Sequence, residues 1–422
     1  MPAQFDRDAR RLWSALSVSL VGSEITLLAL PLFAATKLHL VAFQMGILAA
    51  TGQLPFLLCS LPAGVLADRV RRRPILVACD VGSAVVLATV PLSVMFGGPY
   101  FVQLCLVAFV VGTLAVLSEV AHYAYVPTLV GRDSLTQFNS RLQVSYSVSE
   151  SAGPGLAGVL VQLITAPFAV LIDAFSFVVS AVLLRSVRHV EPRIDNSHSS
   201  TVRSSLVDGL RMLVRHPVLR PIVLTGMFVA FFEQAVVALY VLYAIRDLGL
   251  SSATIGLVFV AGGIAAIPGS MLARVVGDRI GVGPAIVVGL ILSAAAGLLV
   301  PFATGSTVVI ILMLAAAKAI TALTFTVANI HQWSLRQSLT PDELAGRVTA
   351  GQRFIVYGGG SIGALMGGVL GSALGLRPAL MLCVAGGILS PLLLAASPVW
   401  RVREQPTSPA EESENVTDAI DV

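Results

Sequence analysis

Long apolar segments separated by short polar ones run through most of this chain. Segments long enough to cross a bilayer as a helix, about 20 residues, are predicted at residues 12–36, 41–67, 74–96, 100–125, 142–164 and 167–188. After a polar break, six more are predicted at residues 218–245, 253–275, 281–303, 306–330, 347–374 and 376–398. The pattern predicts an all-α membrane protein with twelve transmembrane helices, and it shows none of the alternating segments typical of a β-barrel.

Composition excludes several other classes of protein. The chain is 56% hydrophobic and 12% charged, whereas soluble domains have about a quarter of their residues charged. The four cysteines lie inside apolar segments without CxxC spacing, which predicts no disulfide framework, no metal site and no cofactor. No phosphate-binding loop, nucleophile elbow or zinc-protease motif occurs, so the sequence favours neither an enzyme nor an ATP-driven pump.

The basic residues predict the orientation in the membrane. Most of the 27 lysines and arginines fall in alternate loops and near both ends of the chain, while the opposite loops keep only Lys37, Arg246 and Arg377. Because cytoplasmic loops are enriched in basic residues, we expect a multi-pass membrane protein with both termini in the cytoplasm. The net charge of +4 is spread over membrane boundaries, which argues against nucleic-acid binding.

The two halves of the chain resemble each other at an offset of about 209 residues. Glu24 corresponds to Glu233, and residues 158–160 repeat the Gly-Val-Leu of residues 368–370. Six helices repeated in the same orientation are related by an axis along the membrane normal. We therefore expect an N-terminal bundle at residues 1–188 and a C-terminal bundle at residues 218–400, with a binding site between them.

The polar break at residues 189–217 is the predicted cytoplasmic linker. Its second part repeats Leu206, Leu210 and Leu213 at helical spacing, with Arg203 and Arg211 between them. This pattern predicts a short amphipathic helix at the lipid surface, and a simple tether is the alternative. The tail at residues 401–422 is rich in Glu, Ser and Pro, which predicts disorder.

An acid followed by four bases occupies the polar segment Gly64–Arg73, with the sequence Gly-Val-Leu-Ala-Asp-Arg-Val-Arg-Arg-Arg. It resembles the loop between the second and third helices of the major facilitator superfamily, Gly-x-Leu-Ala-Asp-Arg-x-Gly-Arg-Arg, with Arg71 in place of a glycine. We predict a cytoplasmic gate in which Asp68 pairs with arginines or with a neighbouring helix end; a purely topological anchor is the alternative. The gate candidates are Gly64, Asp68, Arg69, Arg72, Arg73 and Asp80.

The fifth predicted helix resembles the antiporter motif of exporters in this superfamily, Gly-x-x-x-Gly-Pro-x-x-Gly-Gly. Gly153, Pro154 and Gly158 match it, while Ser149 and Ala157 replace glycines. Proline bends a helix, and small neighbours let another backbone approach. An ordinary kinked packing helix is the alternative. Three further segments, 27–32, 127–139 and 208–217, resemble the macrolide-efflux and enterobactin-exporter branch of the superfamily.

Ionisable residues inside the membrane are costly and are candidates for function. Glu24 and Glu233 lie near the middle of the first and seventh predicted helices, and Lys318 lies near the centre of the tenth. We expect both glutamates to line a cavity and to exchange protons there, with Lys318 pairing with one of them when it is unprotonated. A static Glu–Lys network that only holds helices together is the alternative. Three other acids near predicted helix ends are interpreted as structural, namely Glu119, Glu150 and Asp173.

These observations predict a secondary active transporter. The most specific reading is proton-coupled efflux, by alternating access, of small amphipathic compounds such as drugs, antibiotics or siderophores. Its expected partners are a small-molecule substrate, protons and the lipid bilayer, and the resemblance implies a monomer. An importer or facilitator on the same fold is one alternative. A membrane sensor or scaffold that transports nothing is the other.

Overall fold

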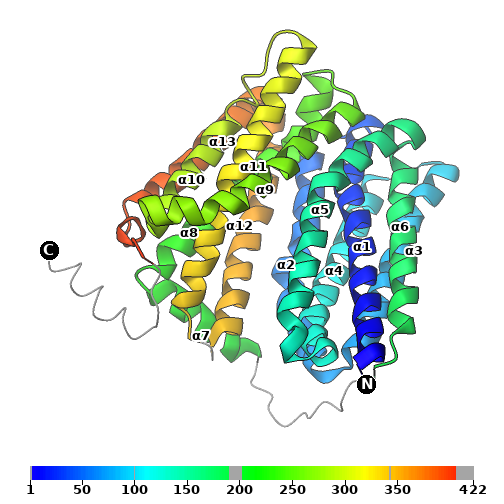
Figure 1. Cartoon of the computed structure of the whole chain (residues 1–422). Coiled ribbons are helices and arrows are strands. Elements are labelled where there is room, and N and C mark those ends of the chain that lie inside the picture. Colours follow the sequence, from blue (N-terminus) through cyan, green and yellow to red (C-terminus); the bar gives the residue numbers. More distant parts are fainter. Residues whose placement is uncertain (1, 99, 190–201, 342–343, 405–422) are drawn as a thin grey trace.

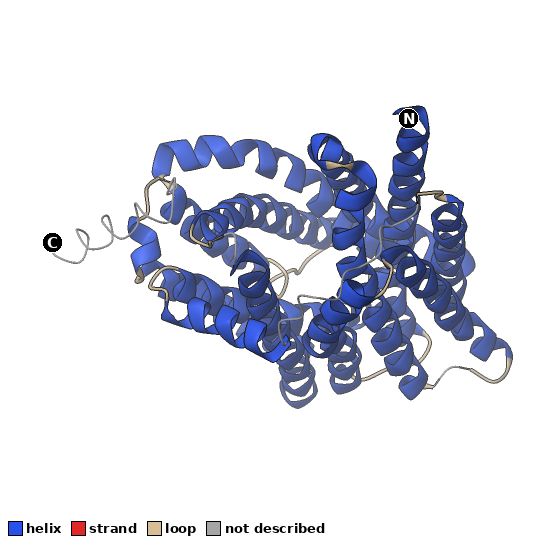
Figure 2. Cartoon of the chain, turned by 90° about the horizontal axis from the view of Figure 1, so that it is seen from below, coloured by secondary structure: helices blue, strands red, loops and turns tan. Residues whose placement is uncertain are grey.

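The computed structural model describes residues 2–98, 100–189, 202–341 and 344–404. Within these residues the chain forms thirteen α-helices and one short 3-10 helix, and no strand. Figure 2 shows this all-helical arrangement. The predicted all-α fold class is therefore confirmed.

The first six helices form the N-terminal half, on the right in Figure 1. They are α1 (Pro2–Thr36), α2 (Ala42–Arg69), α3 (Arg72–Met95), α4 (Phe101–Val130), α5 (Arg132–Ile164) and α6 (Ala166–Ser186). Helix α1 packs against α5 and α6, and α3 packs against α4 and α6. These contacts make one bundle.

The C-terminal half repeats this arrangement on the left of Figure 1. Its helices are α8 (Leu219–Arg246), α9 (Ser252–Ile280), α10 (Val282–Gly297), α11 (Thr307–Ser338), α12 (Ala345–Leu374) and α13 (Leu376–Ala395). Helix α8 packs against α12 and α13, and α11 packs against α9 and α10. Each of the twelve predicted segments thus coincides with one helix of the two halves.

Ten of the described helices are long and apolar enough to cross a membrane. Helix α10 falls short because it has only 16 residues. Helix α5 differs for another reason, since its first turns are polar. It begins at Arg132, ten residues before the predicted start at 142, because polar residues continue the helix beyond the apolar segment.

Helix α7 (Val202–Arg215) lies in the second part of the linker. Leu213 is only 1% exposed and belongs to a hydrophobic cluster with Leu219 of α8 and Val348 of α12. Gly209 lies directly against the backbone carbonyl of Arg347. Part of the apolar face that we expected to lie on lipid therefore packs against the C-terminal half. The first part of the linker, residues 190–201, lies outside the described residues.

The start of the tail is ordered, in contrast to our expectation. The 3-10 helix η2 (Pro398–Arg401) buries Val399 completely. Beyond it, the carbonyl oxygens of Val402 and Arg403 accept hydrogen bonds from the amides of Gly283 and Val282, at 2.8 and 3.1 Å. Residues 401–404 therefore cover the junction of α9 and α10. The rest of the predicted disordered tail, residues 405–422, lies outside the described residues.

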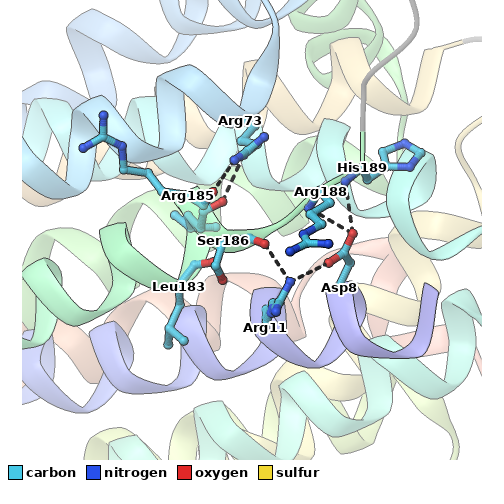
Figure 3. Close-up of polar contacts among 9 residues, drawn as sticks. Asp8, Arg11, Arg73, Leu183, Arg185, Ser186, Arg188 and His189 are labelled. Carbon is cyan, nitrogen blue, oxygen red and sulfur yellow. Dashed lines mark hydrogen bonds and ion pairs between the residues drawn. The ribbon is translucent and has the colours of Figure 1, made fainter. Parts of the chain in front are cut away.

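The N-terminus and α7 lie at the same end of the molecule in Figure 1, which we call the terminal face. A polar network joins α1 to the end of α6 on this face (Figure 3). Asp8, which is 4% exposed, accepts hydrogen bonds at 3.0 Å from the amides of Arg188 and His189. Arg11 donates to the same carboxylate and to the carbonyl of Ser186, at 3.2 and 2.6 Å. The network joins the start of α1 to the chain just after α6 at the terminal face.

Replacing Asp8 by alanine is expected to destabilise this half. The substitution leaves two partly buried amides without their acceptor and removes one of the two acceptors of Arg11, at a cost of about 2 kcal/mol. Thermal denaturation of the purified protein in detergent should show a lower midpoint for Asp8→Ala. The matched control is Arg7→Ala, because Arg7 is exposed on the same helix. Equal midpoints for the two variants would mean that the network contributes no stability.

Candidate functional site

The two halves meet along two helix pairs, α2 with α12 and α5 with α9. Each pair crosses at two glycines. A Cβ atom on Gly46 of α2 would lie 2.7 Å from the carbonyl oxygen of Ala364 and 2.8 Å from Cα of Gly368. A Cβ atom on Gly158 of α5 would lie 2.5 Å from the carbonyl oxygen of Ser252 and 2.9 Å from Cα of Gly256. Only glycine allows backbones to approach this closely.

The two glycine crossings are related by the internal repeat. Gly46 and Gly256 are 210 residues apart, and so are Gly158 and Gly368. The internal repeat therefore relates the crossing of α2 with α12 to the crossing of α9 with α5. Both crossings lie toward the end of the molecule opposite the terminal face, which we call the far face. There Arg246 also donates hydrogen bonds to the carbonyls of His39 and Leu40, at 3.0 and 3.1 Å, from one half to the other.

An ion pair joins the halves nearer the terminal face. Nη2 of Arg353 in α12 lies 2.8 Å from Oε1 of Glu119 in α4, and both side chains are 28% exposed. Tyr123 lies close enough to Arg353 to interact with it electrostatically, and Tyr357, one turn further along α12, stacks on Phe56 of α2 with ring centroids 4.5 Å apart. Arg353 is fifteen residues from Gly368 on the same helix, or about 22 Å. Glu119, which we interpreted as structural, thus takes part in a contact between halves.

A cavity of about 490 Å³ lies mainly within the C-terminal half. Its walls come from α8, α9, α10, α11 and α13, and they are largely apolar, with the aromatic residues Phe232, Tyr240, Phe259 and Phe325. Three ionisable side chains line it, namely Glu233 of α8, Lys318 of α11 and Glu150 of α5. Glu150 is the contribution of the N-terminal half. A cavity of this kind suits a small, largely apolar compound that carries a charge.

Lys318 lies in a cage of aromatic rings. Its Nζ is 4.4 Å from the ring centroid of Phe259 and 4.7 Å from that of Tyr240. The two rings meet edge to face at 5.5 Å. Glu233 is the electrostatic partner of Lys318. The structure therefore brings together two of the three ionisable residues that we expected in the cavity.

Glu24 takes a different position from its repeat mate Glu233. Its Cβ lies against Gly153 of α5, and its carboxylate is close enough to that of Glu150 to interact electrostatically. It is not among the residues that line the cavity, and Glu150 occupies that place instead. Our interpretation of Glu150 as a residue near a helix end depended on the predicted start of this helix at residue 142. Because α5 begins at Arg132, Glu150 lies in the middle of the helix.

The gate candidates lie at the junction of α2 and α3. Gly64, Asp68 and Arg69 belong to the last turns of α2, and the side chains of Asp68 and Arg69 are outside the described part. Arg73, in the first turn of α3, donates hydrogen bonds to the carbonyls of Leu184 and Arg185 at the end of α6 (Figure 3). These contacts are within one half.

Asp80 and Arg72 complete the gate candidates. Asp80 is 4% exposed and lies beside the hydroxyl of Ser180 in α6. Arg72 begins α3, and its Nε is buried. Among the described side chains, Asp80 and Arg72 form no ion pair with each other. The gate role of this segment stays a prediction.

The antiporter-like motif lies where three helices meet. Gly153 gives room to Glu24 of α1, and Gly158 lies at the crossing with α9. The carbonyl of Pro154 lies against Gly256 in the same crossing. The motif therefore lies where α5 packs against α1 of its own half and against α9 of the opposite half.

Comparison with known proteins agrees with this architecture. The sequence model of the Major Facilitator Superfamily matches residues 12–364 and 223–418. The multidrug efflux pump Tap of Mycolicibacterium fortuitum is 25% identical over 380 residues, which cover 87% of this chain and 89% of Tap.

Two solved structures share the fold. One is a bacterial homolog to the human lysosomal transporter Spinster, inward-facing and unoccupied, with a TM-score of 0.73 and 14% identity, covering 95% of this chain and 98% of that one. The other is a bacterial homologue of the iron transporter ferroportin in the inward-facing state, with a TM-score of 0.73 and 18% identity, covering 93% and 98% of the two chains. With two matching six-helix halves and a family match over nearly its whole length, the chain belongs to the Major Facilitator Superfamily of secondary transporters and is not an enzyme.

Proposed function

We propose that this protein is a proton-coupled exporter of small amphipathic compounds, close to the macrolide-efflux and enterobactin-exporter branch of the superfamily. The observation that carries the proposal is the cavity, in which Glu150, Glu233 and Lys318 lie among apolar and aromatic walls. The similarity to the multidrug efflux pump Tap supports the efflux direction. The match of Gly153, Pro154 and Gly158 to the antiporter motif supports it as well.

We assign the terminal face to the cytoplasm of a bacterial cell, following the distribution of basic residues. The glycine crossings then close the periplasmic side of the protein. In this assignment the structure corresponds to an inward-facing arrangement of the halves. Export requires the opposite arrangement as well, with the crossings separated and the terminal face closed.

Exchange of a proton for cargo needs a group that binds both. A carboxylate among apolar walls favours a proton or a cation as its partner, because an unpaired charge is costly in apolar surroundings. Glu233 lines the cavity and has Lys318 as its electrostatic partner, and Glu150 faces the same space from the other half. Either carboxylate can therefore release a proton when cargo arrives. Glu24 interacts with Glu150 but lies outside the cavity lining, so it adds a third carboxylate next to the cavity.

Replacing Glu233 by glutamine is expected to reduce proton-driven efflux strongly. Glutamine keeps the shape of the side chain but cannot exchange a proton or pair with Lys318. The measurement is efflux of a compound panel from a pump-deficient bacterial host, with and without a protonophore. Wild-type efflux should stop when the proton gradient collapses, and Glu233→Gln should lower it at least about tenfold, or 1.4 kcal/mol.

The matched control is Gln234→Glu, which adds a carboxyl at the next position on α8 and keeps Glu233. It should leave the protonophore sensitivity in place, because Glu233 is still present. Undiminished efflux from Glu233→Gln would remove this residue from the mechanism. Efflux that survives the protonophore in the wild type would remove proton coupling itself, and uptake in place of efflux would identify an importer.

A further inference from the structure

The cavity already contains an ammonium group. Lys318 is one of only two lysines in the chain, the other being Lys37. Its Nζ lies over both the Phe259 and the Tyr240 rings, at 4.4 and 4.7 Å from their centroids. Glu233 lines the same cavity and interacts with Lys318 electrostatically, although the two side chains form no ion pair within 4 Å. Two aromatic faces in contact with Nζ, with a carboxylate in the same cavity, form a site suited to an ammonium ion.

The chemistry of this cage is that of an amine-binding site. Aromatic faces attract cations by about 2 kcal/mol or more when the group is desolvated, and aromatic cages recognise ammonium ligands in many proteins. The cage opens into a cavity whose other walls are largely apolar. A compound with a protonated amine on an apolar body would fit both parts of the space.

The charges of the cavity leave room for a second cation. Glu150 and Glu233 contribute two carboxylates when ionised, whereas Lys318 contributes one ammonium group. One further monocation would balance the three ionisable groups. Glu150 belongs to the N-terminal half and Lys318 to the C-terminal half, so an ion pair between these two residues would link the halves.

We propose that Lys318 is a tethered occupant of an ammonium site, and that the compounds carried by this protein displace it with a protonated amine that takes its place between Tyr240, Phe259 and Glu233. The displaced Lys318 then pairs with Glu150 of the opposite half. The assignment of this ligand as cargo rests on the proposed transport function. The ammonium site itself rests on the contacts of Lys318.

The proposal predicts that removing the tethered ammonium strengthens amine binding. The probe is N-butylbenzylamine, with butyl benzyl ether as its uncharged counterpart, and binding is measured by calorimetry on the full chain in lipid nanodiscs at pH 8.5. Lys318→Met, which keeps an unbranched apolar stem, should bind the amine at least about tenfold more tightly than the wild type (about 1.4 kcal/mol). Binding of the ether should change by less than about twofold.

The matched control is Lys37→Met, because Lys37 is the other lysine and is exposed outside the cavity. It should leave the affinities for both probes unchanged. Amine binding that stays the same or weakens in Lys318→Met, with ether binding retained, would overturn the proposal. A parallel gain for amine and ether would also overturn it, since the gain would then come from apolar contact alone.

A measurement on the wild-type chain covers the case in which Lys318→Met does not fold. Reductive methylation with ¹³C-formaldehyde keeps the lysine charge and labels Lys37, Lys318 and the N-terminal amine. The Lys318 methyl resonance should be shifted upfield by the two rings, and adding the amine should move it toward the position of an exposed lysine. A resonance that does not respond to saturating amine would contradict displacement. Both experiments are done without a proton gradient, so a protein that passes them but exports nothing would refute the exporter and leave the ammonium site standing.

Discussion

Replacing Gly256 by alanine is expected to reduce transport at least about fivefold while leaving the protein folded. The added Cβ would lie 2.5 Å from the carbonyl oxygen of Pro154 and 3.0 Å from Cα of Gly158. Backbone atoms cannot give way as a flexible side chain does, so α5 and α9 must move apart. Overpacking of this kind costs about 1–3 kcal/mol, which corresponds to a population shift of about 5- to 150-fold.

The repeat makes the same prediction for the other crossing. A Cβ on Gly46 would lie 2.7 Å from the carbonyl oxygen of Ala364. Gly46→Ala should therefore lower transport by a similar factor. Gly52→Ala is the matched control on the same helix, since a Cβ on Gly52 has no neighbour within 4 Å. It should transport like the wild type.

Distances across the far face distinguish a shifted equilibrium from misfolding. Spin labels on cysteines at Lys37 and Ser251, both exposed, report the separation of the halves in a background without the four native cysteines. Gly256→Ala should shift the distribution toward longer distances. Unchanged distances together with wild-type transport would show that the close approach of the glycines is not needed for the transport cycle.

The helices could be predicted from the sequence because lipid imposes a simple rule. Every spanning segment must be apolar for about 20 residues, so the twelve helices follow from the apolar segments. The rule fails where a helix continues outside the apolar segment. Helix α5 begins at Arg132, and its early turns are polar, which is why the position of Glu150 was misjudged.

The cavity was harder to predict, because it depends on the direction in which each side chain points. Glu24 and Glu233 are repeat mates, yet Glu233 faces the cavity with Lys318 while Glu24 packs on Gly153. The repeat relates backbones, whereas the side chains around them differ between the halves. The aromatic cage needs Tyr240, Phe259 and Lys318 from three helices, and no short motif joins them. The Glu119–Arg353 pair spans 234 residues and could not be found by local pattern either.

Breaking the ion pair between Glu119 and Arg353 is expected to weaken the contact that joins the halves near the terminal face, and so to slow the transport cycle. The pair joins α4 to α12 at 2.8 Å, and each side chain is 28% exposed. Removing one partner leaves the other charge unpaired in a half-buried place, which costs more than losing a surface pair. Glu119→Gln and Arg353→Gln should each lower transport by about tenfold, and the double variant should be no worse than either single one. A double-mutant cycle on transport rates should therefore give a coupling energy of about 1–3 kcal/mol.

The ion pair between Arg274 and Asp278 provides the matched control. It lies within α9 at 3.7 Å, with side chains 92% and 72% exposed, so its coupling should be below about 0.5 kcal/mol. Asp278 lies 210 residues after Asp68 of the predicted gate motif, which is close to the offset of the internal repeat. A larger coupling energy between Arg274 and Asp278 than between Glu119 and Arg353 would indicate that the charged segments at the ends of α2 and α9 form the gate. Each charge reversal alone, Glu119→Arg or Arg353→Glu, should abolish transport, because it places two like charges opposite each other. The variant with both reversals should recover part of the transport. An ion pair between the halves needs opposite charges on α4 and α12, and either helix can carry the positive one.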